Sequence, residues 1–114
     1  MPYSMGRVVG KTLLGSLNLL ILKTLSHGPL HGYAITTRIQ QISDDVLQVE
    51  EGSLYPALHR LEQEGFVSSE WATSDSNRRV RFYELTSKGR RQLKEASDEW
   101  ERMASAIQKV LRYA

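Results

Sequence analysis

Several residue types and motifs are missing from this chain of 114 residues, and each absence removes a class of function. The chain contains no cysteine, which excludes disulfides, thiolate nucleophiles and zinc sites with cysteine ligands. Two of its three histidines, His27 and His31, lie close in sequence, but Gly28 and Pro29 between them interrupt any helix that could direct both toward one metal ion. We therefore expect neither a metal nor another cofactor.

Signatures of catalysis and of membrane insertion are also missing. The chain has no glycine-rich phosphate loop, no dinucleotide-binding fingerprint and no strained Gly-x-Ser-x-Gly turn. The apolar stretch from Leu13 to Leu22 falls short of the ~20 residues that a membrane helix needs, and it lacks a cleavage site of the signal-peptide type. We expect a cytoplasmic protein that is not an enzyme and does not enter a membrane.

The formal net charge of +2 is too small to identify a partner, but the charges are unevenly distributed. Residues 78–94 hold seven cations and one carboxylate, whereas residues 44–70 hold seven carboxylates and one cation. A local cluster of arginine and lysine suits contact with nucleic acid. With 40% apolar and 25% charged residues, the chain has the composition of a globular protein, and its length favours one domain.

Hydrophobic periodicity and turn residues predict a mainly α fold with a small β-hairpin. We expect helices over residues 15–26, 32–42 and 53–65, strands over 67–73 and 79–85, and a last helix from 87 to almost 112. The third helix should begin with Ser53 as its N-cap and Pro56 in its first turn, and residues 47–49 could add a short strand. This order is typical of a winged helix-turn-helix, with residues 1–12 as an arm, 13–86 as the DNA-binding domain and 87–114 as a dimerisation helix.

The predicted third helix has two distinct faces. At the helical period its leucines fall on one narrow arc, which we expect to pack inward: Leu54, Leu58 and Leu61. The opposite arc carries Pro56, His59, Arg60 and Gln63. In a major groove, Arg60 can donate paired hydrogen bonds to a guanine edge or contact a phosphate, and His59 or Gln63 can meet other base edges. Because glutamates flank Arg60, a merely solvated polar face is an equal alternative for this helix alone.

The loop between the predicted strands adds a cationic wing. Asn77, Arg78 and Arg79 lie at this turn, where they can enter a minor groove or bind phosphates. A solvated loop is the simpler alternative. The rival function for the whole chain is a winged helix that binds another protein and not DNA. The salt dependence of binding distinguishes the two functions. DNA binding weakens steeply as the salt concentration rises, whereas binding through an apolar protein interface changes far less.

Three segments closely resemble the PadR family of prokaryotic transcriptional regulators. They are Leu30-His31-Gly32-Tyr33, the run EGSLYPALHRLEQEGFV at residues 51–67, and the run NRRVRFYELTSKG at residues 77–89. The resemblance spans about residues 13–94 and implies a homodimeric repressor that binds double-stranded DNA through a winged helix-turn-helix. It places at or near the DNA Tyr33, Ser53, Tyr55, Pro56 and Arg60, with Arg78 and Arg79 in the wing. The two tyrosines also have a simpler interpretation as packing residues with exposed hydroxyls.

The last helix carries an apolar heptad pattern. Leu93, Trp100 and Ile107 recur every seven residues, and a second series follows three positions later with Ala96, Met103 and Val110. This spacing predicts a seam between two chains, and the resemblance adds the N-terminal helix, with Leu17, to the dimer interface. With one helix after the wing, the chain resembles the short form of the family. The resemblance also suggests a flat aromatic effector between subunits, flanked by Trp100 and Met103.

Overall fold

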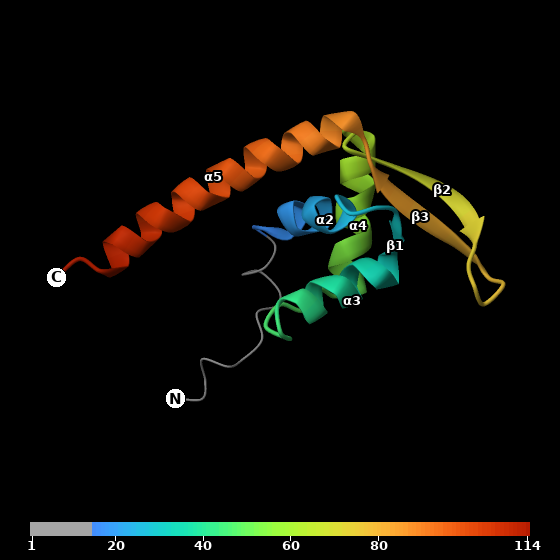
Figure 1. The fold of residues 1–114 in the computed structure, drawn as a ribbon, viewed down its shortest axis with the longest axis horizontal. Helices are drawn as coiled ribbons and strands as arrows, with labels where there is room; N and C mark the ends of the chain where they lie inside the picture. The colour runs from blue at the N-terminus through green and yellow to red at the C-terminus, as the bar shows by residue number, and fades with distance from the viewer. Residues whose placement is uncertain (1–14) are drawn as a thin grey trace.

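The computed structural model describes residues 15–114, which form four helices and one three-stranded antiparallel sheet. In chain order the elements are α2 (Leu17–Leu25), β1 (Leu30–His31), α3 (Gly32–Ile42), α4 (Glu51–Gln63), β2 (Val67–Thr73), β3 (Arg79–Leu85) and α5 (Ser87–Leu111). Figure 1 shows the β2–β3 hairpin projecting from the helices as a wing. The elements confirm the predicted mainly α fold with a small hairpin, whereas the predicted arm at residues 1–12 lies outside the described residues.

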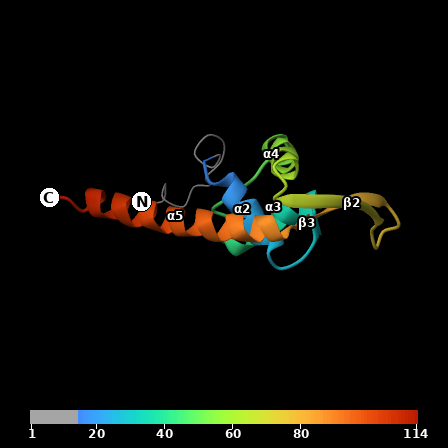
Figure 2. The same ribbon diagram turned by 90° about the horizontal axis from the view of Figure 1, so that it is seen from above.

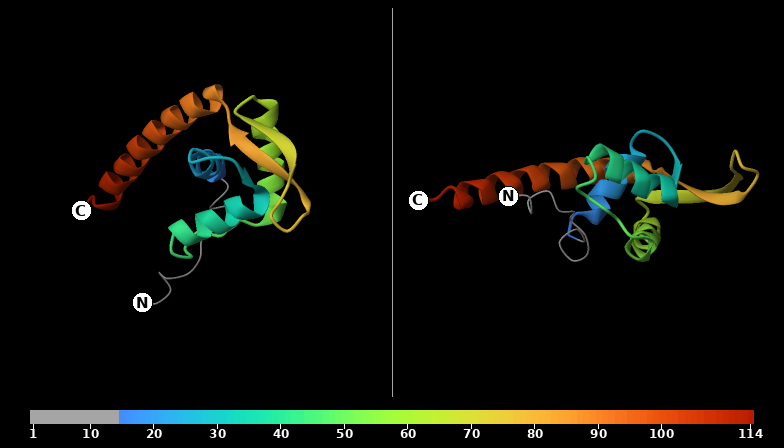
Figure 3. Two further views of the ribbon diagram at one scale, coloured as in Figure 1. Left: turned by 45° about the vertical axis from the view of Figure 1, so that its right-hand side comes forward. Right: turned by 90° about the horizontal axis from the view of Figure 1, so that it is seen from below.

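The core lies where α2, α3 and α4 meet the base of the sheet. α2 is buried on more than one side, since its side chains Leu17, Ile21, Leu22 and Leu25 are each at most 2% exposed. α5 covers α2 from one side, and α3 and α4 enclose it from the other (Figure 1 and Figure 3). The other buried apolar side chains are Ile35, Ile39, Val49, Leu54, Ala57, Leu58, Leu61, Val67, Tyr83 and Leu85.

The sheet has the strand order β1-β3-β2, with β3 in the centre. Its hairpin, β2 with β3, has the predicted boundaries. β1 is not predicted from the sequence, and it pairs Leu30 with Tyr83 and His31 with Phe82. The His31 and Phe82 rings also meet edge to face, with centroids 5.7 Å apart. A strand of two residues leaves no periodic pattern, and its partner lies far along the chain, so local propensity cannot reveal it.

α4 begins two residues earlier than predicted. The carbonyl oxygen of Glu50 accepts hydrogen bonds from the N–H groups of Ser53 and Leu54, both at 3.0 Å. The first turn therefore starts at Glu51, and Ser53 lies inside it and is not the N-cap. No side chain caps this end, but the carboxylate of Glu51 complements the positive pole of the helix dipole.

The earlier start of α4 changes the setting of Pro56. Pro56 lies in the second turn and not, as predicted, in the first, and it removes one backbone hydrogen bond on an exposed face of the helix. The short strand suggested for residues 47–49 is also wrong, because this segment has only an isolated bridge at Leu47. The segment is instead anchored by Val49, whose side chain is only 7% exposed and belongs to the core.

Thr86 fixes the junction between β3 and α5. Its hydroxyl donates to the carbonyl oxygen of Gly65 at 2.7 Å and accepts from the N–H of Gly89 at 3.0 Å, so Thr86 is the N-cap of α5. Gly89 is buried so close to the backbone of Phe66 that a Cβ there would overlap the Phe66 carbonyl oxygen. α5 then runs away from the hairpin, so the C-terminus and the wing tip lie at opposite ends of the long axis (Figure 2).

Candidate nucleic-acid interface

α4 presents an exposed polar face opposite its buried apolar face. The predicted inward leucines, Leu54, Leu58 and Leu61, are at most 2% exposed, so their packing is confirmed. The opposite arc is exposed and carries Pro56, His59, Arg60 and Gln63. The ion pairs within residues 15–114 are Glu62–Arg81 and Lys94–Asp98, so no carboxylate in this range neutralises Arg60.

The turn between β2 and β3 is held by its own hydrogen bonds. The N–H of Ser74 donates to the carbonyl oxygen of Arg78 at 2.8 Å, and the N–H of Asn77 donates to the carbonyl oxygen of Ser74 at 2.9 Å. Asn77 has a φ of 61°, in the left-handed region that asparagine tolerates better than most residues. Asn77, Arg78 and Arg79 are all exposed. A turn fixed through its backbone leaves these three side chains available to a ligand.

One face of the hairpin changes from apolar to cationic along its length. At the base this face is buried, as at Val67 and Tyr83. Toward the tip, the same alternation of strand residues places Trp71, Arg79 and Arg81 on it. The guanidinium carbons of Arg79 and Arg81 lie 5.5 and 5.9 Å from the centroid of the Trp71 ring, which are cation–π distances. The exposed indole therefore holds two arginines on one surface.

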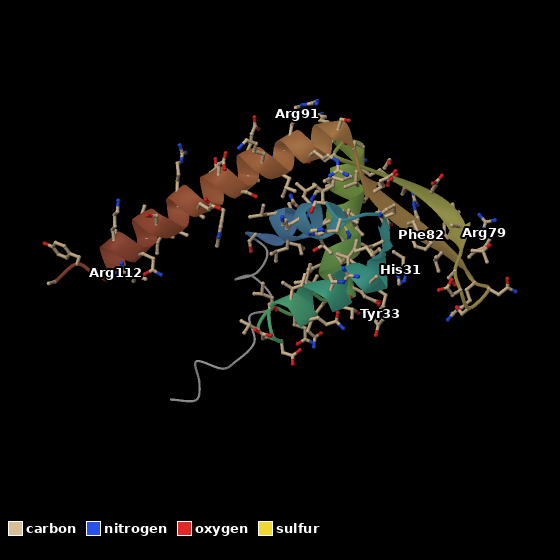
Figure 4. All side chains as sticks on the ribbon, in the orientation of Figure 1. His31, Tyr33, Arg79, Phe82, Arg91 and Arg112 are labelled. Carbon is tan, nitrogen blue, oxygen red and sulfur yellow. The ribbon has the colours of Figure 1, made fainter. Side chains whose placement is uncertain are left out.

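A cleft of about 740 Å³ separates this surface from the N-terminal ends of α3 and α4. Its walls include Tyr33 and Tyr55 on the helices and Trp71, Arg78 and Arg79 on the wing. Figure 4 shows Tyr33 at the start of α3 and Arg79 on the wing. Tyr33 is 66% exposed and Tyr55 is 43% exposed, so both rings reach solvent. A concave surface with arginines and phenolic hydroxyls suits a phosphate backbone, which accepts hydrogen bonds from both.

Two other residues that line the cleft, His31 and Tyr83, have local roles. The Nδ1 of His31 accepts a hydrogen bond from the N–H of Ala34 at 3.3 Å and so caps α3. Tyr83 lies beside Arg81 and is 7% exposed. Burial raises the pKa of the Tyr83 hydroxyl above its ordinary value of 10.0, and the Arg81 cation opposes that rise only in part. The hydroxyl therefore remains a hydrogen-bond donor at neutral pH.

The described part of the chain offers no competing metal or membrane site. No group of three or more metal-ligating side chains occurs within residues 15–114. One nitrogen of His31 is already used in the cap of α3. No helix in that range is long and apolar enough to cross a membrane.

Trp71, Arg81 and Gly32 also belong to this surface, although they are not among the DNA-binding residues predicted from the sequence. Arg81 bonds to α4 and β2, and Gly32 lies under the ring of Tyr55. A signal for Trp71 and Arg81 exists in the sequence. A loop at residues 74–78 makes the flanking residues 73 and 79 a pair, and the register then places Trp71 directly opposite Arg81.

The second half of α5 carries an exposed apolar face at the far end of the molecule. The predicted seam residues there are between 44% and 73% exposed: Trp100, Met103, Ile107 and Val110. An apolar hollow of about 260 Å³ lies along this face. Leu93, by contrast, is partly buried against the core of its own chain. Leu17, grouped with the dimerisation residues, is 2% exposed in that core, so it has no surface to offer a second subunit.

Comparison with known proteins gives a consistent result. The family model of the "Transcriptional regulator PadR-like family" matches residues 21–95. The chain is 35% identical over 92 residues to the transcriptional regulator Rv3488 of Mycobacterium tuberculosis, covering 81% of this chain and 82% of that protein. A solved transcriptional regulator from Clostridium thermocellum is similar with a TM-score of 0.79 and 29% identity, over 88% of this chain and 97% of the other. A PadR-like regulator from Bacillus cereus has a TM-score of 0.78 and 27% identity, over 92% and 100% of the two chains.

Proposed function

The chain belongs to the PadR-like family of transcriptional regulators, which are not enzymes, and on that premise we propose that it is a cytoplasmic homodimeric repressor of one specific DNA sequence. The observation that carries the proposal is the cleft between the wing and the N-terminal ends of α3 and α4. Arginines and exposed aromatic rings line this cleft together. α4, which forms part of the cleft wall, also carries the exposed polar face.

The proposed complex assigns different tasks to α4 and to the wing. In the major groove, α4 contributes base contacts from His59, Arg60 and Gln63. Tyr33 on α3 and Tyr55 on α4 contribute phosphate contacts, and Ser53 and Pro56 lie at or near the DNA. The wing contributes minor-groove or phosphate contacts from Asn77, Arg78 and Arg79. Contacts to phosphate supply most of the affinity and base contacts supply the discrimination.

The division of tasks predicts two different mutant phenotypes. Replacing both Arg78 and Arg79 by alanine should weaken binding to every duplex alike and lower the log–log salt slope by about 2, because two phosphate contacts are lost. Arg60→Ala should instead reduce the preference for the specific duplex by about 1–3 kcal/mol, the usual discrimination of a paired base contact. Equal losses on specific and unrelated DNA from Arg60→Ala would contradict its proposed contact with bases.

Fluorescence anisotropy with DNA from upstream of the gene for this protein, beside an unrelated duplex, tests the proposal across a series of salt concentrations. Arg91→Ala/Arg102→Ala is the matched control, because it removes two exposed arginines from α5 and none from the wing. Figure 4 shows Arg91 on α5, away from Arg79 of the wing. Steep salt dependence that the wing variant loses and the control retains would support DNA binding. Binding to neither duplex at low salt would contradict it and favour the alternative, a winged helix that binds protein.

We also propose that residues 13–86 bind DNA, residues 87–114 join two subunits, and residues 1–12 form an arm. The exposed apolar face on the second half of α5 supports the dimer, since two copies would bury it against each other. A symmetric dimer would place one α4 in each of two major grooves about 10 bp apart on a near-palindromic site. A site selected from random DNA should therefore contain two inverted half-sites at that spacing.

A small flat aromatic effector is the remaining element of the proposal. Trp100 and Met103 are exposed on α5, and in a dimer the two copies of each would face one another across the seam. Titration of a Trp71→Phe variant with planar aromatic compounds would leave Trp100 as the only indole that reports binding. Unchanged emission across a varied set of such compounds would remove the effector from the proposal.

A further inference from the structure

Three polar side chains join the wing to α4 at the point where the hairpin leaves the core. Arg81 of β3 donates from Nη2 to both carboxylate oxygens of Glu62 on α4, at 3.3 Å each. The Nε of Arg81 also donates to the hydroxyl of Ser69 on β2, at 2.8 Å. That hydroxyl donates in turn to Oε2 of Glu62, at 2.6 Å. The three groups thus form a closed ring of hydrogen bonds, called here the wing brace.

The wing brace lies at the point beyond which core packing no longer holds the hairpin. Beyond Ser69, every residue of β2 through Thr73 is exposed, so no core packing fixes this strand farther out. The brace is the outermost side-chain bond from α4 to the hairpin among the residues described. An isolated surface ion pair contributes little to stability. A guanidinium that is bonded to a carboxylate and to a hydroxyl at once also fixes a direction, because its donors are rigidly arranged.

The brace is continuous with the arginines proposed to bind DNA. Arg81 lies 5.9 Å from the ring centroid of Trp71, and Arg79 lies 5.5 Å from the same ring. Trp71 is therefore covered by one arginine that is tied to α4 and by another that faces the cleft. Loss of the bonds that hold Arg81 would therefore disturb its contact with the indole, which Arg79 also contacts.

We propose that Glu62, Ser69 and Arg81 are positioning residues that set the angle of the wing on α4, so that Arg79 and the outer face of α4 meet the same DNA segment. This inference rests on the proposed DNA binding. It assigns a favourable role to a carboxylate that lies beside a DNA-binding surface. Coulomb repulsion from phosphate alone would make that carboxylate unfavourable, so the two explanations predict opposite signs for its removal.

Glu62→Gln distinguishes the two explanations, with Glu64→Gln as the matched control. Glu64 is exposed at the end of the same helix, and its side chain forms no ion pair within residues 15–114. Both variants remove one negative charge. We expect Glu64→Gln to leave DNA affinity unchanged or raise it by up to about twofold. We expect Glu62→Gln to lower affinity by about tenfold, because a misplaced wing loses a charge-assisted phosphate contact.

Ser69→Ala tests the brace without any change in charge. It removes the hydroxyl that links Arg81 to Glu62, and we expect it to weaken DNA binding in the same direction as Glu62→Gln. Thermal unfolding of each variant, monitored by far-UV circular dichroism, verifies that the chain is folded. The emission of Trp71, recorded with all variants in a Trp100→Phe background, reports the wing directly. Iodide should quench Trp71 more in Glu62→Gln and Ser69→Ala than in Glu64→Gln, because the arginines no longer cover the ring.

The possible results distinguish a failure of the proposed DNA binding from a failure of the proposed positioning role of the wing brace. Failure of the unmodified protein to bind DNA would overturn the proposed function and, with it, the role of the brace in DNA binding. Binding by the unmodified protein together with equal or tighter binding by Glu62→Gln would overturn the brace alone. The brace would be supported if Glu62→Gln and Ser69→Ala both bind DNA more weakly and both show a changed Trp71 signal. Glu64→Gln should then show neither weaker binding nor a changed Trp71 signal.

Discussion

Tyr55 reaches the cleft because Gly32 has no side chain. A Cβ on Gly32 would lie 2.5 Å from the phenolic oxygen of Tyr55 and 2.8 Å from the ring carbon that bears it. Gly32 is the first residue of α3, and Tyr55 lies on α4, so this contact joins the two helices of the helix-turn-helix. The ring is 43% exposed and can therefore move away from a new methyl group at little cost in packing.

Gly32→Ala should consequently separate stability from binding. Alanine favours a helix over glycine by about 1 kcal/mol, so the free energy of unfolding should change little or rise. DNA affinity should fall by about tenfold, because the Tyr55 hydroxyl leaves the position from which it is proposed to contact phosphate. Anisotropy titration and urea unfolding of the same preparation measure both effects.

A double-mutant cycle identifies Tyr55 as the cause of that loss. In a Tyr55→Ala background, Gly32→Ala should have no further effect on affinity, since the displaced ring is already gone. Additive losses from the two substitutions would mean that Gly32 acts by another route, such as direct approach of its backbone to DNA.

The sequence predicts individual site residues only where their position depends on neighbouring residues, as on one face of a helix or in a turn. The outer arc of α4 follows from helical spacing, and Arg78 and Arg79 follow from the loop between two recognisable strands. Gly32 gave no such signal, because its role depends on a ring that belongs to the next helix. The hairpin register indicates that Arg81 lies opposite Trp71, but nothing in the sequence indicates its bond to Glu62, which lies on α4, outside the hairpin.

Among the elements, the junction of β3 with α5 depends on close backbone approach. Thr86 bonds the start of α5 to the carbonyl oxygen of Gly65, in the turn before β2. Gly89 then passes the backbone of Phe66 within a distance that leaves no room for a Cβ. A methyl group at this position would overlap a main-chain carbonyl oxygen. That oxygen, unlike the end of a flexible side chain, cannot move away without a shift of the backbone.

Gly89→Ala should therefore lower the free energy of unfolding by about 2 kcal/mol, the usual cost of overpacking a close contact. This cost outweighs the gain in helix propensity. Gly52→Ala is the matched control, because Gly52 is exposed in α4 and nothing lies within 4 Å of its added Cβ. The control should raise stability by up to about 1 kcal/mol. Urea unfolding at one fixed protein concentration measures both variants, and equal stabilities would contradict the tight junction.

Whole elements were more predictable than their ends. α3, β2, β3 and α5 match the prediction closely, since periodicity, a turn of polar residues and a threonine cap each act locally. The start of α4 moved because the backbone of Glu50 begins the helix without a side-chain cap. β1 was missed because two residues become a strand only by pairing with Tyr83 and Phe82 of a distant segment.

The whole molecule is elongated, with the wing and the free half of α5 at opposite ends of its long axis (Figure 2). The core is complete without the second half of α5, because no residue beyond Leu93 belongs to the core cluster or packs against it. The winged domain should therefore fold in the absence of a second subunit. The apolar face from Trp100 to Val110 is exposed and available for the proposed dimer, whereas Leu17 is buried.

Ile107→Glu should give a folded monomer that binds DNA poorly. In a single chain Ile107 is 49% exposed, so a carboxylate there stays hydrated, whereas in a dimer seam it would be buried without a partner. Loss of the second subunit removes the effective concentration that one bound half-site gives the other, and affinity for the full site should fall by about 10²-fold or more. Sedimentation equilibrium and anisotropy titration measure the two effects.

Ser105→Glu is the matched control for Ile107→Glu, because Ser105 is exposed on the opposite side of the same helix. It should remain a dimer and bind DNA as the unmodified protein does. A dimeric Ile107→Glu would place the seam elsewhere on the chain. A monomeric Ile107→Glu that retains full affinity would show instead that one winged domain is sufficient for recognition, and the paired half-sites would then be unnecessary.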